Sequence, residues 1–155
     1  MAQTSETSIT IEDSVIHCDK EIMGGTPIFK RTRVPVKNLF DYLARGYNLK
    51  DFHYDFPTVF REQTYAVLEM ARDALEQEAY NAPNSVFHSD PEIVSGTPVF
   101  VGTRLPIKNL FDCLIAAYSL KDFFYEFPSA NQEQLVAILK MAQEVLEKKA
   151  RADTI

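Results

Sequence analysis

The sequence feature that most constrains the fold is an internal duplication. When His17 is aligned with His88, the chain matches itself without a gap as far as Ala79 and Ala150, and about half of the aligned positions are identical. The longest shared strings are TPIFKRTRVPVKNLFDYL and TPVFVGTRLPIKNLFDCL. A single period of roughly 70 residues is too long for a solenoid repeat and indicates two copies of one compact module.

The two copies divide the chain into four segments. We expect a polar N-terminal tail at residues 1–15, a first module at 16–80, a linker at 81–87 and a second module at 88–151. The linker contains the Asn and Pro residues that are typical of connections. The alternating stretch Ile9 to Glu12 suggests a short additional edge strand in the tail.

Each copy begins with the pattern of a small β-hairpin. In the first copy Gly25-Thr26-Pro27 predicts a turn, Ile28-Phe29 a strand and Arg33-Val34 the returning strand. Gly102 suits the tip of the second hairpin because glycine tolerates positive φ. Arg31 stands at the matching position of the first copy, where we expect it to be strained or to use a different turn.

Three helices should follow the hairpin. Pro35 fits the first turn of a helix that Gly46 ends, whereas the matching helix must end at Ala117 without glycine. Asn48 is a suitable N-cap for a second, short helix, and a longer third helix should run from about Arg61 to residue 79. The predicted fold class is mainly α with a small β-hairpin in each repeat, a duplicated winged helix-turn-helix-like module of three helices. An ordinary small helical domain is the alternative.

The charge distribution bears on nucleic-acid binding. A net charge of −6 at pH 7 speaks against it. The modules themselves are nearly balanced, with nine basic and ten acidic residues in the first and six and eight in the second. The first copy also carries a basic stretch, Lys30, Arg31, Arg33 and Lys37, that could reach phosphates from a hairpin and a helix start. A solvated basic face is the competing interpretation.

The repeated motif resembles a known family. The strings GTPIFKRTRVP and GTPVFVGTRLP, followed by a helix, a Leu-Lys-Asp helix start and Phe-Pro, are similar to the domain-of-unknown-function family 433, a set of small prokaryotic helix-turn-helix modules regarded as antitoxin-like. The second copy has the family's Gly-Thr-Arg core at Gly102 to Arg104, where the first has Arg31 to Arg33. The resemblance implies a DNA-binding or toxin-neutralising role with the long third helix as recognition helix, and it brings no catalytic residues.

We therefore predict a prokaryotic DNA-binding regulator or antitoxin-like protein built as an internal pseudo-dimer, or pairing again as a homodimer. The candidate DNA contacts are basic residues of the hairpins, first helices and long helices, namely Lys30, Arg31, Arg33, Lys37, Arg61, Arg72, Arg104, Lys108 and Lys140. The mixed charge on the outer faces of the long helices is more typical of a solvated surface.

The alternative function is a protein-binding module that caps a partner, such as a toxin, without contacting DNA. The aromatic residues of each short helix are more than one helix face can bury, so Tyr54, Phe124 and Tyr125 are candidate protein contacts. Packing between the repeats is the competing explanation for them.

Catalysis and membrane insertion are not expected. His17 and His88 have no neighbouring nucleophile and no metal-ligand spacing, so we predict no enzyme activity, no metal and no cofactor. Cys18 and Cys113 do not occupy corresponding places and are interpreted as incidental small apolar residues. No secretory signal and no apolar run of about 18 residues is evident, which predicts a cytoplasmic protein with no membrane partner.

Overall fold

The computed structural model describes residues 15–81 and 84–153, which contain six α-helices and two pairs of short strands. The first copy consists of β1 (Ile16–His17), β2 (Ile28–Phe29), α2 (Val36–Ala44), α3 (Leu49–Asp55) and α4 (Arg61–Asn81). The second repeats this order as β3 (Phe87–His88), β4 (Val99–Phe100), α5 (Ile107–Ile115), α6 (Leu120–Glu126) and α7 (Gln132–Asp153). The expected mainly α, duplicated three-helix fold is confirmed. The stretch Ile9 to Glu12 lies outside the described residues.

The strand pairing differs from the expected hairpin. The partner of β2 is the upstream strand β1, in antiparallel register with Ile16 opposite Phe29. The downstream segment makes only an isolated bridge between Ile28 and Pro35. The Thr32 hydroxyl closes that segment into a compact turn by donating to the Phe29 carbonyl, and proline has no N–H with which to extend a ladder. β3 and β4 pair in the same way.

The helix boundaries follow the sequence closely. Asn48 and Ser119 cap α3 and α6, and each forms a reciprocal capping box with the aspartate three residues later. Gly46 and Ala117 end the preceding helices with φ of +97° and +73°. Arg31 has a φ of +68°, so the expected strain at the first-copy turn is present.

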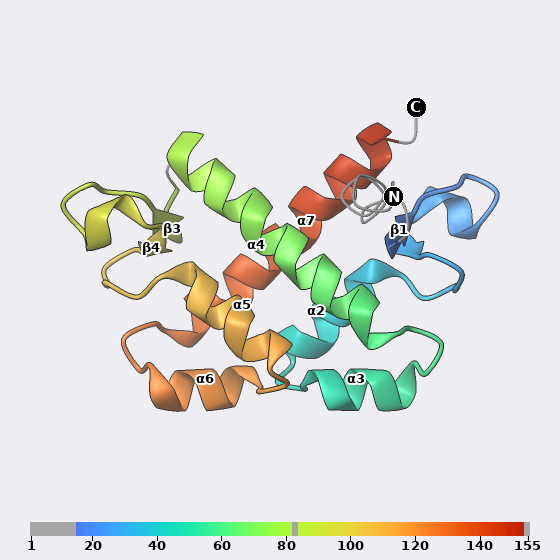
Figure 1. Cartoon of the computed structure of the whole chain (residues 1–155), viewed down its shortest axis with the longest axis horizontal. Coiled ribbons are helices and arrows are strands. Elements are labelled where there is room, and N and C mark those ends of the chain that lie inside the picture. The colour runs from blue at the N-terminus through green and yellow to red at the C-terminus, as the bar shows by residue number, and fades with distance from the viewer. Residues whose placement is uncertain (1–14, 82–83, 154–155) are drawn as a thin grey trace, which may run out of the picture.

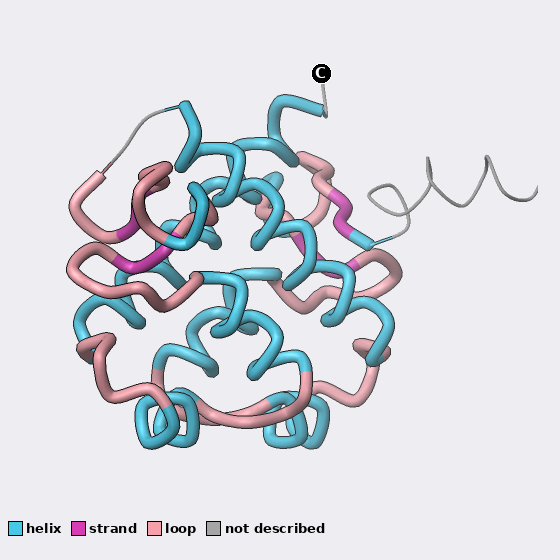
Figure 2. Tube along the Cα trace, turned by 60° about the vertical axis from the view of Figure 1, so that its left-hand side comes forward, coloured by secondary structure: helices cyan, strands magenta, loops and turns pink. Residues whose placement is uncertain are grey.

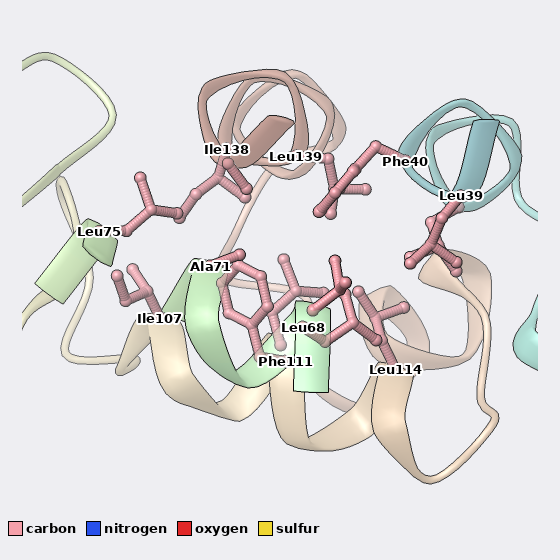
Figure 3. Close-up of a cluster of buried hydrophobic side chains, with 14 of the residues drawn as sticks. Leu39, Phe40, Leu68, Ala71, Leu75, Ile107, Phe111, Leu114, Ile138 and Leu139 are labelled. Carbon is pink, nitrogen blue, oxygen red and sulfur yellow. The ribbon is translucent and has the colours of Figure 1, made fainter. Parts of the chain in front are cut away.

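The long helices bury their apolar faces against the other copy. α4 packs along α7 and against α5, and α7 packs against α2. Figure 1 shows α4 and α7 crossing each other. In Figure 3, Leu68 and Ala71 of α4 meet Phe111 and Leu114 of α5 and Leu139 of α7 in one continuous, fully buried core. Neither copy can cover these side chains alone, so the two form one interlocked pseudo-dimer.

Because the two copies interlock, the strand pairs and the short helices α3 and α6 lie at the periphery of the molecule (Figure 1). The two strand pairs lie on opposite sides of the helical body (Figure 2). α3 and α6 lie at the same end of the molecule and run outward from its centre in opposite directions, away from the free ends of α4 and α7 (Figure 1). Among the described residues, no helix is both long and apolar enough to cross a bilayer.

Candidate functional site

A turn rich in basic residues lies between β2 and α2. We call Lys30, Arg31, Arg33 and Lys37 the basic turn, and all but the half-buried Lys30 are exposed. Gln63 fixes the turn to the start of α4, because its side-chain amide donates to the Lys30 carbonyl at 3.1 Å. The turn is therefore held in place on the surface.

Gln63 was not among the residues singled out from sequence. Its side-chain oxygen also accepts from the backbone N–H of Phe60 at 2.9 Å, which caps α4. Gln134 does the same in the second copy, donating to the Val101 carbonyl at 2.9 Å and accepting from the Asn131 N–H at 3.1 Å. Retention of this glutamine in both copies was the available sequence signal.

The charges of the basic turn have no carboxylate partner in the described part of the chain. None of the ion pairs found there involves Lys30, Arg31, Arg33 or Lys37. Exposed and unpaired cations of this kind can contact phosphate or carboxylate oxygens. In the matching turn of the second copy, Val101, Gly102 and Arg104 stand in place of Lys30, Arg31 and Arg33, so only one of these three cations is retained.

The other predicted DNA contacts do not gather with the basic turn. The Arg72 guanidinium lies 3.7 Å from the Asp112 carboxylate of α5 and so joins the two copies. Lys108 lies near this contact, where it and Arg72 oppose the burial that raises the pKa of Glu76. The rest are exposed but lie on separate elements: Arg61, Arg104 and Lys140.

The long helix α4, the expected recognition helix, buries its apolar face in the contact between the two copies. Its buried residues are Thr64, Val67, Leu68, Ala71, Leu75 and Ala79. The exposed side mixes acids and bases, with Arg61, Glu62, Glu69 and Asp73. Such a mixture gives little net attraction to phosphates. α4 is poorly suited to entering a DNA groove.

Exposed aromatic side chains lie on and just before α3 and α6, the two short helices at the same end of the molecule (Figure 1). Tyr54 of α3 and Tyr125 of α6 occupy matching positions and are each 86% exposed. In the turns before these helices Tyr47 and Tyr118 are 48% and 56% exposed, and Phe124 is 42% exposed. We call these five residues the aromatic face. Exposed aromatic clusters of this kind mark interaction surfaces for proteins.

Two cavities lie along the aromatic face. The first, of about 500 Å³, is lined by Tyr54 and Tyr65 on one side and by the turn at Ile115–Ala117 of the second copy on the other. The second, also of about 500 Å³, is lined by Tyr118 and Tyr125. Because the first cavity takes its walls from both copies, the pseudo-dimer builds a surface that neither repeat has alone.

The exposed charges of the two short helices are mainly acidic. Each short helix exposes one lysine and two carboxylates: Lys50, Asp51 and Asp55 on α3, and Lys121, Asp122 and Glu126 on α6. This balance repels a nucleic-acid backbone and suits a protein surface of mixed or basic charge.

His53 joins α3 to the start of α4 beneath the aromatic face. Its Nδ1 lies 3.0 Å from the Val59 carbonyl and its Nε2 lies 3.0 Å from the Thr64 hydroxyl. Burial lowers the pKa of His53, although the bond to Val59 opposes the shift. Phe124 and Leu135 replace the His–Thr pair in the second copy, so this polar link is specific to the first.

The other two histidines lie in separate strand pairs, His17 in β1 and His88 in β3. The His17 ring lies 3.8 Å from the Asp19 carboxylate. His88 buries its Nε2 without a hydrogen-bond partner among residues 15–81 and 84–153. Within the same ranges, no cluster of three or more His, Cys, Asp or Glu side chains is placed to hold a metal ion.

The fold and surface define a class, a duplicated helix-turn-helix-like module whose two copies share one core. Comparison with family models then places the chain: the model described as "Protein of unknown function (DUF433)" matches residues 16–71 and 88–142. The chain belongs to this family as two tandem copies, which confirms the expected resemblance. No curated protein and no solved structure matched the chain.

Proposed function

We propose that this chain is a cytoplasmic, non-catalytic protein-binding module that captures a partner protein through the aromatic face, as a toxin-neutralising protein would. The observation that carries the proposal is the pair Tyr54 and Tyr125, each 86% exposed at matching positions of two helices at the same end of the molecule (Figure 1). Tyrosine is enriched among the residues that dominate binding energy, because it buries a large ring while its hydroxyl still finds a partner.

The surroundings of the two tyrosines support a protein partner over a nucleic acid. Lysines are outnumbered by carboxylates on both α3 and α6. The cavity lined by Tyr54 and by the turn at Ile115–Ala117 offers a recess for a partner side chain. A recess with a polar rim is common in specific protein interfaces.

A capture experiment tests this function. The full chain, tagged and expressed in its natural host, should retain a stoichiometric partner. Replacing Tyr54 and Tyr125 together with Ser should reduce the retained partner by at least about tenfold, because losing two buried aromatic contacts with the partner costs several kcal/mol of binding free energy.

The matched control is Tyr80→Ser, which removes a tyrosine that is 58% exposed near the end of α4, away from the aromatic face. This variant should retain the partner as the unaltered chain does. If every retained protein is lost equally from both variants, or from neither, the aromatic face is not the binding surface.

A second candidate function, nucleic-acid binding, is favoured by the basic turn alone. Its four cations are unpaired in the described residues and lie away from the acids of α3 and α6. In this case the hairpin end of the first copy would contact the phosphate backbone, and the sequence-reading residues would have to come from elsewhere. A regulator of the chain's own promoter is the form that this function would take.

Binding to promoter DNA across a salt series, with unrelated DNA as competitor, tests the second candidate. We expect a shallower salt dependence when Lys30, Arg31, Arg33 and Lys37 are replaced with Ser. The slope of the logarithm of the binding constant against the logarithm of salt concentration should fall by about 3 to 4, since each lost phosphate contact removes about 0.9 from it. Replacing Lys50 of α3 and Lys121 of α6 is the control and should leave the slope unchanged. Unaltered binding by the first variant would exclude the basic turn as a DNA contact.

A further inference from the structure

The two copies differ at one position beside the aromatic face. In the first copy Tyr42 packs its ring against Tyr47, Phe52 and Phe56, at centroid distances of 5.3, 5.6 and 5.5 Å. Its hydroxyl donates to the Asp55 carboxylate at 2.5 Å, and this bond raises the pKa of Tyr42. The first copy therefore fills this place with its own phenol.

In the second copy the matching residue is Cys113, and the space is open. A cavity of about 500 Å³ is lined by Cys113, Tyr118, Lys121, Asp122, Tyr125 and Glu126. Apart from Cys113, every lining residue is identical to its first-copy counterpart except Glu126, which replaces Asp55. The rings beneath keep their arrangement, since Phe123 and Phe127 lie 4.9 Å apart, as Phe52 and Phe56 do. The pocket is the Tyr42 site without its tyrosine.

The chemistry of the empty place is that of a ring-binding pocket. Burial raises the pKa of Cys113 to about 11, so its thiol stays neutral near pH 7 and forms an apolar wall. Tyr118 and Tyr125 offer aromatic surface to a planar ligand. Glu126 supplies the carboxylate acceptor that Asp55 supplies in the first copy, and the volume falls within the range of small-molecule sites.

We infer that the second copy carries a binding pocket for a phenol-type ring, which would lie where Tyr42 lies in the first copy and whose hydroxyl would donate a hydrogen bond to the Glu126 carboxylate. The inference rests on the comparison of the two repeats and does not depend on the aromatic face binding a protein. A free phenolic molecule and the tyrosine side chain of another protein share the required chemistry.

Alkylation of Cys113 measures occupancy of the pocket directly. The full chain with Cys18→Ser leaves one thiol, and this background is mild because Ser89 replaces Cys18 in the second copy and makes the same bond to a glycine carbonyl. p-Cresol, which has the side chain of tyrosine, should slow the alkylation about fourfold when three-quarters of the pocket is occupied. A small ligand of this size should need millimolar concentrations.

Two matched variants locate the binding, measured by the line broadening and shift of p-cresol NMR signals. Cys113→Tyr rebuilds the first-copy arrangement, keeps the fold and should abolish binding. Tyr42→Cys opens the matching place in the first copy and should raise the number of bound p-cresol molecules from one to two. A Glu126→Gln variant should still bind, with weaker affinity for p-cresol than the unaltered chain has.

The outcomes separate the two sources of ligand and the failure of the inference. If p-cresol and N-acetyltyrosine amide both protect Cys113, the pocket accepts a tyrosine side chain; if only p-cresol does, it takes a small free phenol. No protection of Cys113 up to the solubility of p-cresol, or equal p-cresol binding by Cys113→Tyr, overturns the inference.

Discussion

Replacing Leu68 with Ala should destabilise both copies at once. Leu68 is fully buried on α4, in a core that continues into α5 and α7 of the other copy. Truncation of a buried leucine costs about 2 to 5 kcal/mol in free energy of unfolding, from lost apolar transfer and from the cavity left behind. With roughly 2 to 4 °C per kcal/mol at this chain length, a cost of about 3 kcal/mol lowers the melting temperature by about 6 to 12 °C. Leu139, its fully buried counterpart on α7, should cost the same.

Urea unfolding followed by far-UV circular dichroism and by tyrosine fluorescence measures this cost, since the chain has seven tyrosines and no tryptophan. Both probes should give one coincident transition, with the midpoint lowered and the slope unchanged in Leu68→Ala and in Leu139→Ala. Peptide-resolved hydrogen exchange should show α5 and α2 losing protection together in each variant. Two separate transitions, or loss of protection confined to the copy that carries the substitution, would refute the shared core.

Two further changes probe single positions. Gly46→Ala should lower the free energy of unfolding by about 1 kcal/mol, because φ is +97° at this position. Ala117→Gly should raise the free energy of unfolding by up to about 1 kcal/mol, since the φ of +73° strains the alanine side chain. Thermal unfolding measures both changes. The pKa of His53 in the folded chain is lowered from 6.5, so the unfolded chain binds a proton at this histidine more readily than the folded chain does. The free energy of unfolding is therefore unaffected by the protonation of His53 well above pH 6.5 and falls as the pH drops below 6.5. His53→Phe should reduce the loss of stability between pH 7.5 and pH 5 in urea unfolding; an identical pH dependence in both proteins would assign the loss to other groups.

Local structure followed from the sequence wherever one residue type decides the backbone. Asn48 and Ser119 cap helices because their side chains accept a backbone N–H three residues on. The positive φ of Arg31 was predictable because the second copy has Gly102 at the matching position. These local conformations depend on residues close in the chain, and the second copy provided an independent example of each position.

Long-range pairing could not be predicted in the same way. The apolar spacing of α4 showed that one face is buried, but not that α5 and α7 of the other copy bury it. Likewise β2 pairs with Ile16–His17, where no strand was predicted, and the expected return segment is instead closed into a turn by the Thr32 hydroxyl. In both cases the sequence pattern did not determine the partner.

The candidate sites divide in a similar manner. Tyr54 and Tyr125 were identified because the short helices carry more aromatic residues than one face can bury. The pocket at Cys113 was missed, since a small apolar residue is ordinary in a helix and only the three-dimensional contacts of Tyr42 show what space its replacement opens.

The most direct test of the central claim is site-specific photocrosslinking in the natural host. A photoreactive amino acid placed at position 54 or 125 of the full chain should give one crosslinked partner protein of the same mass from either position. The same residue at position 80 or 31 should give no such product. Crosslinks to that partner from position 80 or 31 alone, or crosslinks to different proteins from 54 and 125, would contradict the aromatic face as a single binding surface.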